Sequence, residues 1–402
     1  MLNNIINIYF LGIGGIGMSA LARWCHIKNF LVQGWDDNPD TPLLNTLFAE
    51  GIEIHNKLKK HIFLSSFNSF NKENTILIYT PAISMDHDIL NAFNSKGISI
   101  YKRSELLQFI SKDYQVVAIA GTHGKTTMSI MLSHILKFSG IHCNAFFGGI
   151  SKNYNTNFMI GNSDIMVIEA DEYDKSFLKL EPKYSLISAL DKDHGDIYKS
   201  YDDMLNSYQT FIHQTTHKVI GNKKLDKLFD YTYSSFLDAD IFATNIESSF
   251  NNSGFKDGIY KQSKICFSIN FPNGQCVQTG LFNSSYYNVD NAIGAASLAF
   301  FLGVSPVDIG RALLKFRGIK RRWEYQLLSP NLIFIDDYAH HPEELKALIN
   351  NVRKLYKNRK VFLIFQPHLF SRTKELEDDF ISVLSSVDQL LLLDIYPARE
   401  IP

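Results

Sequence analysis

The sequence has few cysteines, no excess of charge and no long apolar run. Its four cysteines are scattered over 402 residues without a C-x-x-C pair, so we expect the reduced thiols of a cytosolic protein, with only a Cys266–Cys276 bond across a hairpin left open. Lys and Arg number 40 against 41 Asp and Glu, which gives no electrostatic reason to expect nucleic acid or an anionic membrane as a partner. No apolar run reaches the ~18 residues that a membrane-spanning helix needs.

Strands and helices are expected to alternate along the chain, which is typical of the α/β class with parallel sheets. Three parts each contain an apolar strand that leads into a helix, and these strands are expected at 6–11, 115–120 and 331–338. The sequence ends at Pro402, directly after an expected strand. A doubly wound sheet normally continues with further strands and helices, so we expect the third part to be truncated.

Residues 121–127, GTHGKTT, lie between an expected strand and an expected helix, which is the context of a phosphate-binding loop. Its two glycines let the backbone wrap phosphate oxygens. Lys125 can neutralise phosphate charge, and the Thr126 hydroxyl can hold Mg²⁺. The strict pattern G-x-x-x-x-G-K-[ST] requires a glycine where this chain has Ile119. A helix start with a chance Gly-Lys-Thr is the alternative, which the strand-to-helix context disfavours.

Acidic and imidazole side chains follow the next two expected strands. Glu169 comes directly after an apolar run, and His194 follows the next run in the segment LDKDHGD. The carboxyl ends of parallel strands form the sheet edge where ligands bind. A carboxylate and a neutral imidazole at that edge can hold Mg²⁺ beside the phosphate loop. For Asp171, Glu172 and Asp191 nearby, a solvated loop position is an equally good interpretation.

The glycine cluster at residues 12–17 follows a strand and opens a helix, so its backbone amides can approach a pyrophosphate. Asp36 lies about 20 residues further on, where a carboxylate can bind a ribose hydroxyl. Tight packing of the strand on the helix is the structural alternative. NAD and a UDP-linked substrate both offer a pyrophosphate and a ribose, so this cluster alone does not distinguish an oxidoreductase from an enzyme that acts on a nucleotide sugar.

Basic and polar residues gather around the start of the third part. Arg322, in the segment GIKRRWEY, can clamp a transferring phosphoryl group, although basic runs are more often solvated. The segments DDYAHHPEE and QPHLFSRT place polar side chains at two strand ends, and Arg372 there can bind a carboxylate through two hydrogen bonds. Asn288 and Asn291 suit either a helix cap or the reading of an adenine edge.

Taken together and in this order, the motifs resemble those of the Mur ligases. The segments that carry the resemblance are FLGIGGIGMSALA, GTHGKTT, EADEYD, DKDHGDIY, NVDNA, KRRWEY, DDYAHHPEEL, QPHLFSRT and LLLDIYPAREIP. The departure from the strict phosphate loop is itself the pattern of that family. The resemblance implies a Rossmann-like UDP-sugar domain over 1–113, a central ATPase domain over 114–317 and a Rossmann-like C-terminal domain over 318–402, which lacks several tens of residues present in relatives.

The resemblance also implies a cytoplasmic, ATP- and Mg²⁺-dependent ligase of peptidoglycan synthesis that joins L-alanine to UDP-N-acetylmuramate through an acyl phosphate. It implies as catalytic residues Lys125, Glu169, His194 and Arg322, and as metal ligands Thr126, Glu169 and His194. The implied ATP contacts are Gly121, Thr122, His123, Gly124, Lys125, Thr126, Thr127, Asn291, Asp337 and His341. The implied substrate contacts are Gly14, Gly15, Asp36, Arg103, Tyr338, His368 and Arg372.

Several alternatives remain open at this point. Leu369 stands where many Mur ligases carry an arginine after QPH, so recognition of the alanine carboxylate would depend on Arg372. A recycling ligase that adds a tripeptide to the same nucleotide sugar is the main rival. A binding-only remnant, inactive through truncation, and an NAD-dependent oxidoreductase are the others, and the oxidoreductase leaves GTHGKTT, Glu169 and His194 without a role. The sequence leaves both a monomer and a homodimer open.

Overall fold

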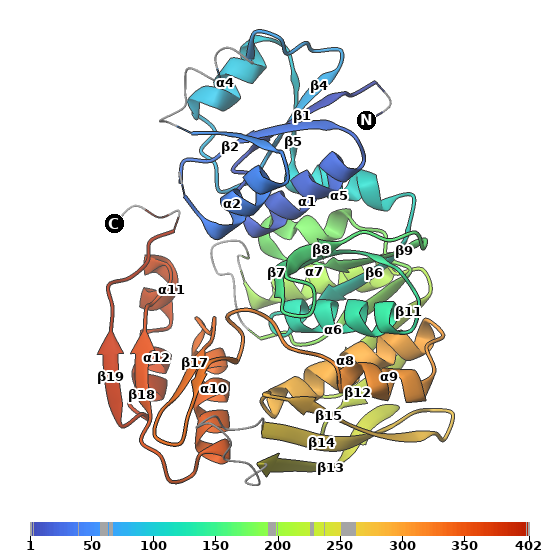
Figure 1. The fold of residues 1–402 in the computed structure, drawn as a ribbon, viewed down its shortest axis with the longest axis vertical. Helices are drawn as coiled ribbons and strands as arrows, with labels where there is room; N and C mark the ends of the chain where they lie inside the picture. Colours follow the sequence, from blue (N-terminus) through green and yellow to red (C-terminus); the bar gives the residue numbers. More distant parts are fainter. Residues whose placement is uncertain are drawn as a thin grey trace.

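The computed structural model describes residues 2, 4–38, 40–56, 63, 67–191, 198, 200–225, 229–236, 238–250, 263–398 and 400. Figure 1 shows three parts that follow the order of the sequence. The N-terminal part lies above a larger central part, and the C-terminal part lies beside the lower half of the molecule. The expected three-part α/β architecture is confirmed.

The first part is built on a sheet of five parallel strands in the order β3-β2-β1-β4-β5. From N- to C-terminus its strands are β1 (Asn7–Leu11), β2 (Leu31–Trp35), β3 (Glu53–His55), β4 (Thr75–Tyr79) and β5 (Ser99–Lys102). Its described helices are α1 (Ile16–Ile27), α2 (Pro42–Ala49), α4 (Asp88–Ser95) and α5 (Arg103–Ser111). β1 confirms the strand expected at 6–11, and β3 is the shortest strand of this sheet, with three residues.

The central part contains a ten-stranded sheet in the order β15-β14-β13-β12-β11-β10-β6-β9-β7-β8. Its strands are β6 (Gln115–Ala120), β7 (Asn144–Ser151), β8 (Thr156–Met159), β9 (Ile165–Glu169), β10 (Tyr184–Ile187), β11 (Lys218–Asn222), β12 (Tyr231–Ser234), β13 (Ile241–Phe250), β14 (Ser263–Asn270) and β15 (Cys276–Phe282). β6 pairs in parallel with β9 on one side and β10 on the other. The ends of β9 and β10 therefore flank the loop that follows β6, as the sequence predicted.

Helices cover both faces of this sheet. α6 (Lys125–Phe138), α8 (Tyr287–Phe301) and α9 (Pro306–Leu313) share one apolar cluster with Val117 and Ile119 of β6. The alternate β6 residues, Val116 and Ala118, belong to a second cluster with η2 (Tyr173–Lys179) and α7 (Tyr201–Gln214). This second cluster also includes residues of α1 and α5, so the first and central parts share one hydrophobic core.

The C-terminal part has two pairs of strands in separate sheets. β16 (Glu324–Leu328) and β17 (Ile333–Asp336) are antiparallel, whereas β18 (Phe362–Phe365) and β19 (Gln389–Leu392) are parallel. The helices are α10 (Pro342–Leu355), α11 (Phe370–Glu375) and α12 (Glu377–Leu384). The sequence did not predict β16. Because β17 pairs with β16 and no hydrogen bond joins it to β18 among the described strands, this part does not form a single doubly wound sheet.

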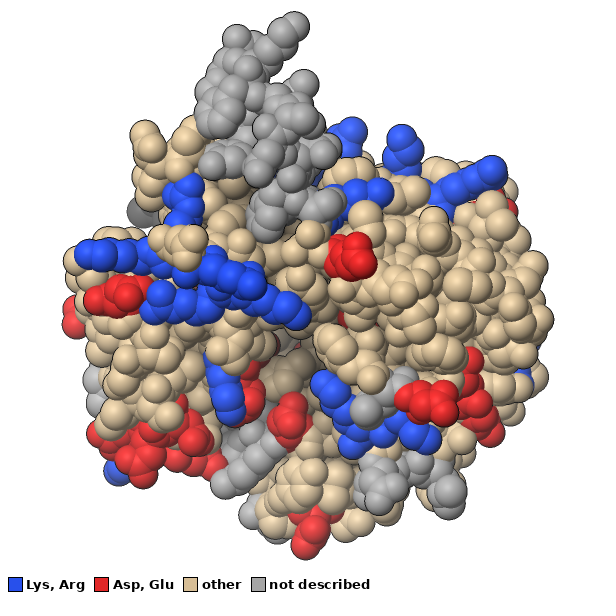
Figure 2. All heavy atoms as spheres, turned by 90° about the horizontal axis from the view of Figure 1, so that it is seen from below, with Lys and Arg blue, Asp and Glu red and all other residues tan. Residues whose placement is uncertain are grey.

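The described residues also bear on the expectations from composition. Cys266 lies opposite Gly280 and Cys276 lies opposite Asn270, and all four cysteines are free, as predicted. Within the described chain, no helix has the length and apolarity to span a membrane. Seen from below, the surface carries patches of both signs (Figure 2), in keeping with the balanced composition.

Gly34 of β2 provides a test of the first sheet. An added Cβ at this position would lie 2.7 Å from the carbonyl oxygen of Phe10 and 2.5 Å from Cδ1 of Ile13. We expect Gly34→Ala to lower the free energy of unfolding by about 1–3 kcal/mol through overpacking, measured by urea unfolding followed by circular dichroism. Leu31→Ala on the same strand, where the side chain is 61% exposed, should change it by less than about 0.5 kcal/mol. Equal losses in both variants would contradict this account.

Candidate functional site

The loop between β6 and α6 requires its two glycines. Gly121 has φ 123° and Gly124 has φ 82°, in the left-handed region that favours glycine. A Cβ on Gly121 would also lie 2.2 Å from Oγ of Ser188. The backbone N–H of Thr122 donates to the carbonyl of Ala189 at 3.0 Å, which ties the loop to the end of β10. The first turn of α6 has N–H groups without helical partners, and such groups suit phosphate oxygens.

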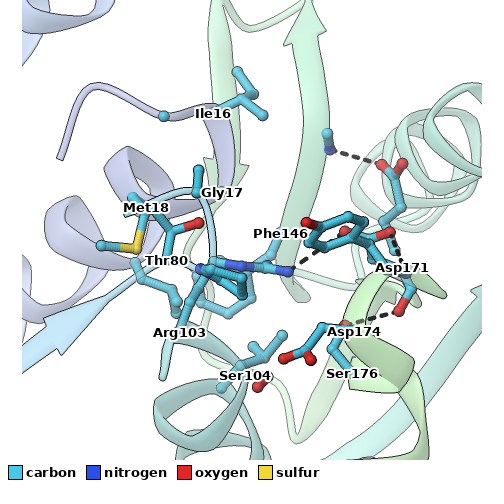
Figure 3. A pocket seen from close by; sticks show the side chains of 18 of the residues that line it. Ile16, Gly17, Met18, Thr80, Arg103, Ser104, Phe146, Asp171, Asp174 and Ser176 are labelled. Atoms are coloured by element: carbon cyan, nitrogen blue, oxygen red, sulfur yellow. Dashed lines mark hydrogen bonds and ion pairs between the residues drawn. The ribbon is translucent and has the colours of Figure 1, made fainter. Parts of the chain in front are cut away.

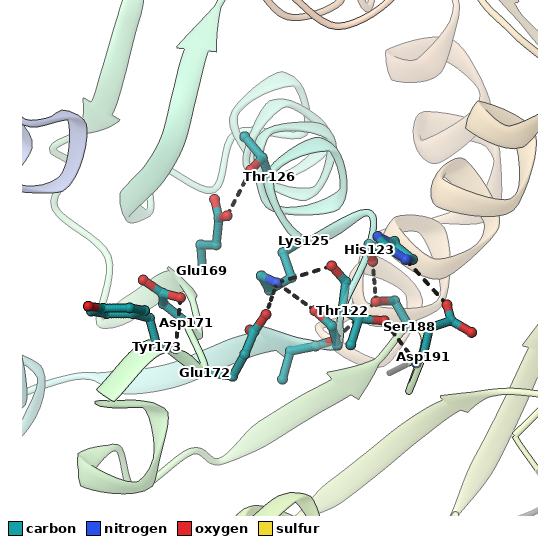
Figure 4. A network of polar contacts seen from close by, with 12 residues as sticks. Thr122, His123, Lys125, Thr126, Glu169, Asp171, Glu172, Tyr173, Ser188 and Asp191 are labelled. Carbon is teal, nitrogen blue, oxygen red and sulfur yellow. Dashed lines mark hydrogen bonds and ion pairs between the residues drawn. The ribbon is translucent and has the colours of Figure 1, made fainter. Parts of the chain in front are cut away.

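Thr126 and Glu169, the predicted ligands of one Mg²⁺, lie in contact (Figure 4). Oγ1 of Thr126 donates to Oε1 of Glu169 at 2.7 Å, and the Gly148 N–H donates to Oε2 at 2.6 Å. Burial raises the pKa of Glu169, and the charge of Lys125 opposes that rise. A carboxylate beside a hydroxyl is an oxygen donor set that Mg²⁺ prefers, so these residues fit the ion.

His194, the third predicted metal ligand, lies outside the described residues. Among the residues that are described, no three or more His, Cys, Asp or Glu side chains form a metal-binding cluster. The role of His194 therefore stays a prediction.

Lys125 is held at the loop by a buried ion pair. Its Nζ lies 2.8 Å from Oε1 of Glu172 and donates to the carbonyl of Gly121 at 2.6 Å. Burial disfavours the charged form, but Glu172 and Asp171 outweigh it, so the pKa of Lys125 is raised. The sequence offered Glu172 only as one of several strand-end carboxylates. Its side chain is 1% exposed, directly before the turn η2, and no sequence motif indicated this burial.

A cavity of about 300 Å³ lies between the first and central parts (Figure 3). Gly15 and Arg103 line it from the first part, and Glu169 and Asp171 line it from the central part. Nη2 of Arg103 lies 3.5 Å from Oδ2 of Asp171, so an ion pair joins the two parts at the cavity. Two of the predicted substrate contacts, Gly15 and Arg103, therefore share a cavity with the predicted metal ligand Glu169.

Gly14 and Asp36, two other predicted substrate contacts, are bonded to each other. The Gly14 N–H donates to Oδ2 of Asp36 at 2.8 Å, and the Asn38 N–H donates to Oδ1 at 3.0 Å. A Cβ on Gly14 would lie 2.8 Å from Asp36 Oδ2, so this contact requires the glycine. Burial raises the pKa of Asp36 despite the two N–H donors. Neither residue lines the cavity of about 300 Å³.

Asn291, in helix α8, lies against Gly124 of the phosphate loop. A Cβ on Gly124 would lie 2.5 Å from Oδ1 of Asn291, and Nδ2 of Asn291 donates to Oδ1 of Asn288 at 3.0 Å. The N-cap of α8 is Tyr286, which makes no side-chain capping bond. The helix-cap interpretation of the two asparagines is therefore wrong, because they bond to each other inside the helix. Asn288 also lines a smaller cavity of about 90 Å³ together with Thr127 and Arg322.

Asp337 and His341 lie where the third part meets the central part. Asp337 is partly buried and accepts the Trp323 N–H at 2.7 Å and the Ala339 N–H at 2.9 Å, and desolvation raises its pKa. His341 is the N-cap of α10, and its ring centroid lies 5.7 Å from that of His123 in the phosphate loop. The structure thus brings His341 near the loop, whereas Asp337 binds the backbone N–H of Trp323 and Ala339.

Tyr338 and His368 belong to a row of rings at the strand ends of the third part. The row runs Tyr338–His340–His368–Tyr396, with successive centroids 5.1, 5.9 and 5.6 Å apart. Arg372 lies in the short helix α11, next to this row in the chain. The sequence placed Tyr338, His340 and His368 at strand ends and predicted substrate contacts for Tyr338 and His368, but it did not single out Tyr396. Tyr396 follows β19, so the strand-end rule applied to that strand would have found it.

Three family models match consecutive stretches of the chain. They are the Mur ligase family catalytic domain over residues 7–115, the Mur ligase middle domain over 119–299 and the Mur ligase glutamate ligase domain over 321–402.

Curated relatives are similar over nearly the whole chain. A UDP-N-acetylmuramate–L-alanine ligase of Cytophaga hutchinsonii is 40% identical, over 100% of this chain and 85% of that protein. An enzyme of the same name from Porphyromonas gingivalis is 40% identical, over 98% of this chain and 86% of that protein. Among solved structures, the UDP-N-acetylmuramate–alanine ligase of Thermotoga maritima matches with a TM-score of 0.79 and 25% identity. The match covers 98% of this chain and 86% of that protein's chain.

The buried Lys125–Glu172 pair provides a test of the site. We expect Glu172→Gln to lower the free energy of unfolding by about 3 kcal/mol, because it leaves a buried lysine without its nearest counter-charge. Asp174→Asn is the matched control. It removes the carboxylate from an ion pair with Lys102 of similar length, 2.7 Å, in which both side chains are 35% exposed, so the loss should be below about 1 kcal/mol. Denaturant unfolding of both variants would show equal losses if the burial of Glu172 did not matter.

Proposed function

This chain belongs to the Mur ligase family, and on that premise we propose that it joins L-alanine to UDP-N-acetylmuramate and converts ATP to ADP and phosphate. The observation that carries the proposal is the cavity that runs from the first glycine loop to Glu169. Glu169 accepts a hydrogen bond from Thr126, which with Lys125 begins α6. One end suits the nucleotide sugar and the other suits the phosphates of ATP. We assign the first role to residues 1–113, the second to 114–317 and acceptor binding to 318–402.

A carboxylate is a poor acyl donor, and phosphorylation gives it a good leaving group. In the proposed first step an oxygen of the lactyl carboxylate attacks the γ-phosphorus of ATP and ADP leaves. In the second step the alanine amine attacks the acyl carbon, phosphate leaves and the nitrogen loses a proton. Two anions must meet in the first step, and Lys125 and Arg322 would offset their charge.

Thr126, Glu169 and His194 would hold Mg²⁺. When bound, the ion neutralises phosphate charge and polarises a phosphoryl oxygen. The contact between Thr126 and Glu169 supports this assignment, because their oxygens already lie together beside the loop. The remaining loop residues, with Asn291, Asp337 and His341, would contact ATP.

The acceptor would bind at the row of rings in the third part. Arg372 would bind the alanine carboxylate in two hydrogen bonds, with Tyr338 and His368 beside it. Leu369 is buried, and it gives no second cation for that carboxylate. On the donor side, Gly14, Gly15, Asp36 and Arg103 would hold the nucleotide sugar. Free thiols at all four cysteines are in keeping with a cytoplasmic enzyme.

The first test is phosphate release from ATP by the 402-residue chain with Mg²⁺ and UDP-N-acetylmuramate, with and without L-alanine. We expect release to require both substrates and to stop when EDTA removes the metal. Release with a tripeptide but not with L-alanine would replace the proposal by a recycling ligase. Binding of ATP and UDP-N-acetylmuramate without release would reject catalysis by this chain.

The metal-ligand assignment has its own test. We expect Glu169→Gln to reduce the rate of phosphate release by at least about 10²-fold, because the amide lacks the charge that holds Mg²⁺. Binding of UDP-N-acetylmuramate, measured by calorimetry, should persist because the glycine loop is unchanged. Glu181→Gln removes an exposed carboxylate of the same part and should leave the rate within about two-fold. Unchanged turnover in Glu169→Gln would remove Glu169 from the site.

A further inference from the structure

Glu344 touches both the phosphate loop and the row of rings. It is the third residue of α10, and its side chain is 20% exposed. Oε1 lies 3.3 Å from Nδ1 of His123 in the loop. Oε2 accepts the backbone N–H of His340 at 3.1 Å and lies 3.5 Å from Nδ1 of the same residue. One carboxylate therefore joins a residue of the central part to a residue of the third part.

Helix capping accounts for only half of these contacts. A Glu at the third position of a helix commonly accepts a backbone N–H from the residues just before the helix, and the bond from His340 is of this kind. That role gives no reason for the other oxygen to approach His123, which lies more than 200 residues earlier in the chain. The contact with His123 is a tertiary one that spans the boundary between two parts.

The bridge is ionic in character. Burial disfavours a charged His123, but Glu344 and Asp191, whose Oδ2 lies 3.4 Å from Nε2, outweigh it and raise the pKa of His123. Burial likewise disfavours a charged Glu344, yet His123 and His340 hold the pKa of this carboxyl well below its ordinary value. A partly buried ion pair is screened less by solvent and salt than an exposed one.

His340 connects the bridge to the acceptor side. Its ring lies 5.1 Å from that of Tyr338 and 5.9 Å from that of His368, the two side chains assigned to the amino acid. A shift of Glu344 relative to the loop would therefore move the ring row relative to the phosphates of ATP.

We propose that Glu344 is a positioning residue that couples the ATP site to the amino-acid site. By holding His340 against His123, it fixes the acceptor pocket over the phosphate loop, so ATP bound at the loop favours binding of L-alanine. Linkage requires that L-alanine then favours binding of ATP by the same factor. This inference rests on the proposed function for the identity of the two ligands.

Calorimetry tests the coupling without turnover. The Kd of a non-hydrolysable ATP analogue is measured in the presence of Mg²⁺ and UDP-N-acetylmuramate, with and without L-alanine. In the original chain we expect L-alanine to lower the Kd of the analogue by at least about five-fold, which is at the lower end of allosteric couplings. In Glu344→Gln, which keeps an acceptor for the His340 N–H but has no charge for His123, we expect this factor to fall to about one.

Glu343→Gln is the matched control, because Glu343 is the adjacent residue of α10, its side chain is 57% exposed and its carboxylate lies 3.4 Å from Nζ of Lys346. It should keep the full coupling factor. The turnover assay supplies a second readout, in which Glu344→Gln should raise KM for L-alanine about as much as coupling is lost while kcat changes less.

A pair of further variants tests the bridge itself. In a His123→Gln background, the effect of Glu344→Gln on the coupling factor should disappear, because the interaction is already broken. Additive effects, a coupling factor kept by Glu344→Gln, or no coupling in the original chain would each overturn the proposal. Phosphate release that requires both substrates, together with any of these results, would leave the proposed function standing and reject the coupling alone.

Discussion

The parallel pairing of β6 with β9 and β10 is the constraint on which the whole site depends. Parallel neighbours end at the same sheet edge, so the loop after β6 lies between the residues that follow the other two strands. This brings the carboxylate of Glu169 to the hydroxyl of Thr126 and ties Thr122 to Ala189. Both faces of β6 are buried in apolar clusters, which hold the carboxyl end of the strand in place. The turn from β6 into α6 is made by the loop glycines Gly121 and Gly124, both with positive φ.

The carboxylates at this edge lie beside cations before any ligand binds. Lys125 lies among Glu169, Asp171 and Glu172, each of which raises its pKa, Arg103 lies 3.5 Å from Asp171, and Arg322 opposes the rise in the pKa of Glu169. A divalent cation that arrives with the phosphates of a nucleotide adds positive charge to this cluster. The Lys125–Glu172 pair keeps the ammonium group at the loop, so little reorganisation is needed when phosphate takes over as its partner.

Sequence reasoning succeeded where a local rule determines the position of a residue. The strand-end rule brought Glu169 to the phosphate loop, and glycine spacing located the turns at Gly121 and Gly124. It left alternatives open where tertiary contacts decide. Asn291, for which the sequence allowed either a helix cap or a nucleotide contact, lies against the loop. Glu172, for which a solvated position was an equally good interpretation, is 1% exposed.

The third part shows the same division between local and tertiary signals. β17 confirms the strand expected at 331–338, but its antiparallel partner β16 was not predicted. Glu344 was overlooked because its partner His123 is distant in the chain. A contact between separate parts leaves no periodic pattern, so only the folded arrangement identifies it.

The first part and the third part meet the central part through different kinds of contact. The first part shares an apolar core with the central part through α1 and α5, whereas the third part has its own small core. Ile319 and Trp323 at the start of the third part make apolar contacts with the central part. Beyond them, polar contacts between the two parts include Tyr286 N–H to Asn351 Oδ1 at 2.9 Å and the His123–Glu344 pair. Polar interfaces permit relative movement more readily than shared cores do.

The linker between the central and third parts sets the direction in which the chain leaves the central part. Gly318, Arg321 and Trp323 all have positive φ, at 90°, 59° and 47°, and two of them are not glycine, so the chain direction there is held by contacts such as Trp323 N–H to Asp337 at 2.7 Å. A donor site on the rigid interface and an acceptor site on the adjustable one suit a reaction in two steps. The nucleotide sugar and ATP must be held still for phosphoryl transfer, whereas the amino acid must enter afterwards and the product must leave. Opening the site between the central and third parts disturbs no shared apolar core of the kind that joins the first and central parts, so it costs less free energy.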